Sequence, residues 1–75
     1  MPTQLHWISV QEAADILTRN SGHRILPNYV NLRSHIGVEH IEGKIRKKVV
    51  DGRTNAYCYE DVINYVVRKN NYPER

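Results

Sequence analysis

Five of the chain's eleven lysine and arginine residues lie within ten consecutive positions, 44–53, which contain one carboxylate. Five positive charges minus one negative charge give +4 for this segment, whereas the whole chain carries +3, so the remainder sums to about −1. The five cationic residues are Lys44, Arg46, Lys47, Lys48 and Arg53. Phosphates recur along a nucleic-acid duplex, and clustered Lys and Arg side chains can neutralise several of them. The segment therefore predicts a polyanion-binding surface, although a run of cations can also be an ordinary solvated surface.

Catalytic and metal-binding chemistry find little support in the sequence. Glu60 and Asp61 are adjacent, so on a helix their carboxylates diverge and cannot form a convergent acid–base pair. Cys58 has no evident base to activate it, and we expect it to be a packing or edge residue. The four histidines, none of them at compact ligand spacing, are His6, His23, His35 and His40. We therefore expect no enzymatic activity, no metal site and no other cofactor.

Length and composition limit the class of protein. A chain of 75 residues has room for one domain, near the lower size at which burial offsets chain entropy. Its 40% hydrophobic and 25% charged residues are typical of a folded globular domain. A single cysteine excludes an internal disulfide and favours a reducing compartment. Because no targeting segment or membrane-spanning stretch stands out, we expect a cytoplasmic protein without membrane contact.

The first helix has a well-marked start. Ser9 is a good N-cap, and Glu12 follows three positions later, as in a capping box. The apolar residues that recur at helical spacing after the cap are Val10, Ala13, Ala14 and Leu17. Residues 18–22 favour turn geometry and should end this helix.

A second helix is expected from Leu26 or Pro27 to about Gly37, because proline is tolerated in a first helical turn and glycine is a common terminator. Its predicted buried row consists of Tyr29, Leu32 and Ile36. Its predicted exposed residues are Asn28, Asn31, Arg33, Ser34 and His35.

A β-hairpin and a third helix complete the expected domain. Residues 41–50 mix β-branched and basic side chains, Asp51 and Gly52 suit a tight turn, and residues 55–59 return as the second strand. The pattern leaves the register open, with a loop of two or four residues. A last helix is predicted from the apolar row Tyr59, Val62, Ile63 and Val66, with Arg68 and Lys69 in its last turn. Residues from about 70 to 75 should form a frayed tail.

Two segments resemble excisionase-like and mercury-resistance-regulator-type DNA-binding domains. Residues 7–17, WISVQEAADIL, are similar to the short strand-like entry and first helix of those families. Residues 52–62, GRTNAYCYEDV, are similar to their junction between wing and following helix. Together with the order of elements, the resemblance implies a single winged helix-turn-helix domain over residues 1–75: α+β and mostly helical, with a helix-turn-helix, a β-hairpin wing and a C-terminal helix. The chain departs from that pattern at residues 18–26, an insertion long enough to tilt or shift the second helix.

The resemblance also implies a function, which is sequence-specific binding of duplex DNA. The second helix would enter the major groove, with Asn28, Asn31, Arg33, Ser34 and His35 as the recognition residues. The wing would clamp the backbone with Lys44, Arg46, Lys47, Lys48 and Arg53. In such contacts Arg suits guanine and Asn suits adenine.

The biological role stays open between a recombination directionality factor and a small transcriptional regulator. A single small module makes few base contacts, so we expect a homodimer, a cooperative array on DNA, or a recombinase or transcription partner. An alternative function is a protein–protein adaptor that uses the same fold to dock an acidic partner on its basic hairpin. Salt-dependent binding to duplex DNA would distinguish these functions.

Overall fold

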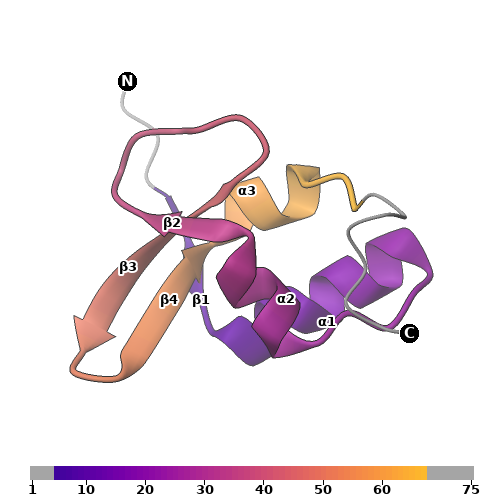
Figure 1. Cartoon of the computed structure of the whole chain (residues 1–75), viewed down its shortest axis with the longest axis horizontal. Coiled ribbons are helices and arrows are strands. Elements are labelled where there is room, and N and C mark those ends of the chain that lie inside the picture. Colours follow the sequence, from indigo (N-terminus) through magenta and orange to yellow (C-terminus); the bar gives the residue numbers. More distant parts are fainter. Residues whose placement is uncertain (1–4, 68–75) are drawn as a thin grey trace.

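The computed structural model describes residues 5–67, which form three helices and one four-stranded mixed sheet (Figure 1). The elements follow in the order β1 (Trp7–Ile8), α1 (Val10–Ser21), α2 (Pro27–Leu32), β2 (Ser34–Ile36), β3 (Ile45–Asp51), β4 (Thr54–Cys58) and α3 (Tyr59–Asn64). Helices account for 38% and strands for 27% of the described residues. The expectation of a mostly helical winged helix-turn-helix domain is therefore wrong. The chain is an α+β protein in which the sheet is a principal element.

The sheet has the strand order β1-β4-β3-β2. β4 pairs antiparallel with both β1 and β3, whereas β2 pairs parallel with β3. β3 and β4 form a hairpin as expected, but its turn lies one residue later than predicted, because Asp51 belongs to β3 and pairs with Thr54. Gly52 and Arg53 form the two-residue connection, and a register shift lies between Val49 and Asp51. This irregularity interrupts the two-residue alternation of β3 next to the turn. In Figure 1 the hairpin projects away from the helices toward the lower left.

The start of α1 confirms the prediction from local sequence, whereas its end lies at the last residue of the predicted 18–22 exit, because residues 18–21 are still helical. The Ser9 hydroxyl accepts a hydrogen bond from the Glu12 backbone N–H at 3.1 Å. At the other end Gly22 adopts a left-handed φ of 78°, and its N–H donates to the Thr18 carbonyl at 3.0 Å. Ala13, Ala14 and Leu17 are buried as expected, and Ile16 joins them.

The second helix is shorter than predicted. α2 ends at Leu32, and residues 34–36 pair with β3 instead of continuing the helix. The Arg33 carbonyl already accepts a hydrogen bond from the Ile45 N–H at 2.9 Å. These residues have only modest helix propensity, so pairing with a neighbouring strand outweighs it. The predicted helix to Gly37 is wrong at its C-terminal half, and Ser34 and His35 belong to a strand.

The predicted buried rows of the second and third helices are also partly wrong. Tyr29 is buried, but Leu32 and Ile36 are 60% and 66% exposed, and Val30 is buried instead. In α3 only Val62 of the predicted row is buried, and the helix ends at Asn64, two residues before Val66. The exposed members of that row are Tyr59, Ile63 and Val66. Arg68, Lys69 and the tail at about 70–75 lie outside the described residues.

The hydrophobic core joins all three helices to the hairpin. Its fully buried side chains include Leu17, Tyr29, Val30, Ile45 and Val62. The connection after α1 is held to this core, because Ile25 is buried and its N–H donates to the Thr18 hydroxyl at 2.9 Å. Within residues 5–67, no helix has both the length and the apolar character that crossing a bilayer requires. This core fixes the position of α2 relative to β3 and β4.

Candidate nucleic-acid interface

An open groove of about 370 Å³ lies between α2 and the hairpin, and we call it the hairpin groove. Its lining residues are Val10, Pro27, Asn28, Asn31, Arg53, Asn55 and Tyr57. They come from the start of α1, from α2, from the hairpin connection and from β4. Among the described residues that line the groove, none is acidic. Three residues predicted to bind DNA, Asn28, Asn31 and Arg53, thus lie together.

Lys47 reaches the groove from β3. Its ammonium nitrogen Nζ donates a hydrogen bond to Asn31 Oδ1 at 2.8 Å. The Tyr57 hydroxyl donates to the same oxygen at 3.3 Å. Lys47 and Tyr57 are directly opposite each other in the β3–β4 register, so their side chains emerge on the same face. The cation, the phenol and the α2 amide therefore form one connected polar group at the groove.

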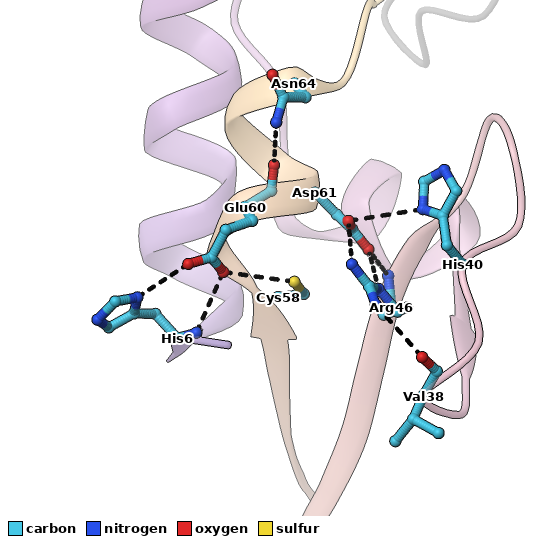
Figure 2. A network of polar contacts seen from close by, with 8 residues as sticks. All are labelled: His6, Val38, His40, Arg46, Cys58, Glu60, Asp61 and Asn64. Carbon is cyan, nitrogen blue, oxygen red and sulfur yellow. Dashed lines mark hydrogen bonds and ion pairs between the residues drawn. The ribbon is translucent and has the colours of Figure 1, made fainter. Parts of the chain in front are cut away.

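Arg46, the residue before Lys47, is bound elsewhere. Its guanidinium makes a two-pronged ion pair with Asp61 of α3, through Nε to Oδ2 at 2.7 Å and Nη2 to Oδ1 at 2.8 Å (Figure 2). The Arg46 backbone N–H also donates to Asp61 Oδ2 at 3.0 Å, and Nη1 donates to the Val38 carbonyl at 3.3 Å. The predicted wing contact of Arg46 is not brought into the groove.

Arg46 and Asp61 each stabilise the charged form of the other. Hydrogen bonding to Asp61 raises the pKa of Arg46. Burial opposes ionisation of the Asp61 carboxyl, but the hydrogen bonds and charge of Arg46 outweigh it and hold the Asp61 pKa below its ordinary value. His40 Nδ1 lies 3.7 Å from Asp61 Oδ1 on the outer side of the pair. Asp61, part of the GRTNAYCYEDV segment, thus ties α3 to β3.

Glu60, the neighbouring carboxylate, points the other way. Figure 2 shows it directed toward His6, next to β1, whereas Asp61 faces β3. Glu60 accepts hydrogen bonds from the His6 backbone N–H at 3.1 Å, and its Oε2 lies 2.9 Å from the ring Nδ1 of the same residue. The hydrogen bonds from the ring and backbone of His6 lower the pKa of Glu60 to about 2. The predicted divergence of the two carboxylates is confirmed. Cys58 is buried, which confirms its packing role and raises the pKa of its thiol.

The remaining cations of the 44–53 segment lie away from the groove. The Lys48 ammonium is 4.8 Å from the centre of the Trp7 ring, in a cation–π contact. Successive strand residues emerge on opposite faces, so Lys48 and Lys47 face different sides of the sheet. Lys44 precedes β3 and lines a different cavity, of about 680 Å³, together with His40, Glu42 and Asp61. Of the five cations in the segment, only Lys47 and Arg53 are placed at the groove.

Three further predicted recognition residues also lie outside the groove lining. The Arg33 guanidinium carbon lies 5.4 Å from the centre of the Tyr29 ring. The Ser34 hydroxyl donates to the Asn31 carbonyl at 2.9 Å, and His35 pairs with Arg46 in the parallel register of β2 and β3. Sequence reasoning missed Asn55 and Tyr57 as groove residues. Their spacing places them on one face of a strand, but only the register shows which face meets α2.

Comparisons with known proteins give no family assignment. Neither the protein-family models, nor the curated proteins, nor the solved structures contain a match to this chain.

Proposed function

We propose that this chain binds double-stranded DNA through the hairpin groove and has no enzymatic activity. The observation that carries the proposal is the convergence of α2 and the hairpin. Asn28 and Asn31 from the helix line the same groove as Arg53, and Lys47 bonds to Asn31 at its edge. Polar amides and cations without an intervening carboxylate suit a polyanionic backbone.

The proposed role is that of a recombination directionality factor or a small transcriptional regulator, as the resemblance of residues 7–17 and 52–62 implies. A groove with two cations contacts few phosphates, so useful specificity requires a second copy, an array along the DNA, or a recombinase or transcription partner. The proposed location is the cytoplasm, where a single unpaired thiol such as Cys58 stays reduced.

The test compares two variants that remove equal charge. In the groove variant, Lys47→Gln is combined with Arg53→Gln; in the control variant, Arg19→Gln is combined with Lys44→Gln. The affinity of each protein for a fluorescent DNA duplex is measured by anisotropy across a salt series. Each lost phosphate contact reduces the slope of log K against log salt by about 0.9, so the groove variant should lose about 1.8 and bind about tenfold more weakly or worse. The control should keep most of the wild-type slope.

Three results would argue against this function. Wild-type binding that does not respond to salt would exclude a phosphate-dominated contact. Equal losses in both variants would mean that net charge alone attracts DNA. Unchanged duplex affinity in the groove variant, together with lost capture of an acidic protein, would favour the adaptor function instead.

A further inference from the structure

The Asn31 side chain has its acceptor end occupied. Lys47 Nζ and the Tyr57 hydroxyl both donate to Oδ1, at 2.8 Å and 3.3 Å. A lysine ammonium carries only donors, so the atom that it contacts must be the carbonyl oxygen of the amide. An amide oxygen has two lone pairs, and here each has a donor. The orientation of the Asn31 amide is therefore set by its neighbours in the protein.

The consequence is that Asn31 offers a ligand only N–H groups. Asn31 lies exposed on α2, with its Nδ2 as the remaining polar end. Recognition of adenine by asparagine needs one donor and one acceptor from the same amide. The acceptor oxygen of Asn31 is already bonded to Lys47 and Tyr57. The expected bidentate contact with adenine is therefore not available while these two hydrogen bonds are formed.

The surroundings of Asn31 favour an oxyanion. Lys47 uses one N–H on Asn31 and has two more to donate. Arg53 lines the same groove, as do the rotatable amides of Asn28 and Asn55. Hydrogen bonds from charged donors to phosphate are among the strongest in proteins. Resting on the proposed function, we infer that the hairpin groove holds a backbone phosphate of DNA at Asn31, and that this residue positions the duplex without reading its bases.

Asn31→Asp is the sharpest test, because the two side chains have nearly the same shape. The aspartate still accepts hydrogen bonds from Lys47 and Tyr57, but it replaces the N–H donors with a negative charge. Binding is measured by anisotropy on two duplexes of equal length, one of alternating A·T pairs and one of alternating G·C pairs. Affinity for both should fall by the same factor, about tenfold, and the salt slope should fall by about one.

Two further variants keep the result interpretable. Asn20→Asp makes the same chemical change at an exposed position of α1 outside the groove lining, and its affinity should stay within about twofold of wild type. Asn31→Ala removes the donor without adding charge, and it should weaken binding to both duplexes equally, by about threefold. If circular dichroism shows that Asn31→Asp is unfolded, the affinities of Asn31→Ala for the two duplexes test the inference in its place.

The outcomes separate this inference from the function on which it rests. A wild-type protein that binds neither duplex overturns the proposed function, and the phosphate site with it. If the wild type binds, a loss confined to the A·T duplex shows that Asn31 reads adenine and overturns the inference alone. Unchanged affinity of both Asn31 variants on both duplexes places the phosphate elsewhere and likewise leaves DNA binding intact.

Discussion

Arg46 and Lys47 are consecutive residues of the same strand, and they have opposite surroundings. The Arg46 side chain is 17% exposed and is paired with Asp61, whose side chain is 6% exposed. Lys47 lies on the other face of β3, where its ammonium meets the Asn31 amide at the hairpin groove. The first cation joins a strand to a helix inside the domain, and the second belongs to the proposed DNA surface.

The difference shows that the number of cations in a segment overstates the number available to a ligand. Strand alternation sends neighbouring side chains to opposite faces, and each face meets different partners. Arg46 forms an ion pair with Asp61, and the Lys48 ammonium lies over the Trp7 ring. Two cations remain at the groove, so the salt dependence of DNA binding should reflect about two phosphate contacts at this site rather than five.

The largest effect should come from Arg46→Gln. Removing the guanidinium leaves the buried Asp61 carboxylate without its charge partner, and breaking such a pair costs about 3 kcal/mol of folding free energy. Urea unfolding followed by Trp7 fluorescence measures the change. Among molecules that remain folded, DNA affinity should stay close to wild type, because Arg46 lies outside the groove lining.

Lys47→Gln is the matched control one position away. Its unfolding free energy should change by less than about 0.5 kcal/mol, because glutamine can still donate to Asn31 and no buried charge is left unpaired. Its DNA affinity and salt slope should fall. If the two substitutions had the same effects on stability and binding, the division of β3 into a structural and a ligand-facing side would be wrong.

A smaller effect is expected from Glu60 in acid. Its pKa is lowered from 4.5 to about 2 by hydrogen bonds from His6, so between these pH values the unfolded chain takes up a proton that the folded protein does not. This contribution to stability is present above about pH 4.5 and is lost as the pH falls toward 2. The urea midpoints of wild type and Glu60→Gln should therefore converge over this range. Midpoints that keep a constant separation over this pH range would contradict the stabilising hydrogen bonds between His6 and Glu60.

The smallest effect is expected from Lys48→Gln. An exposed cation–π contact contributes about 0.5 kcal/mol, so the loss of stability should be near the limit of measurement. Trp7 fluorescence should change, because it is the only tryptophan and the ammonium lies over its ring. The DNA salt slope should fall less than in Lys47→Gln. An equal fall would mean that both faces of β3 contact the duplex.

The sequence predicted those features that depend on neighbouring residues. Ser9 caps α1 through a residue three positions away, and Gly22 ends it through a bond to Thr18. The sequence left a hairpin loop of two or four residues open. The pairing of Asp51 with Thr54 in the β3–β4 register shows that the loop has two residues. The error over residues 34–36 has a different origin, because their partner strand begins at Ile45 and contributes hydrogen bonds that no local pattern contains.

The candidate site shows the same division. Residue type alone indicated that the 44–53 segment is cationic and that the amides of residues 28 and 31 are polar groups suited to nucleic acid. Which cations stand beside those amides depended on the β3–β4 register and on Asp61, fifteen positions after Arg46. The charge of a side chain follows from the residue type. The direction in which that side chain points, and the group with which it pairs, depend on contacts between segments that are distant in the sequence. Tertiary packing therefore placed Arg46 against Asp61 and Lys47 beside Asn31. It also brought Lys47 and Tyr57 to the amide oxygen of Asn31, which leaves only the N–H groups of that amide for a ligand.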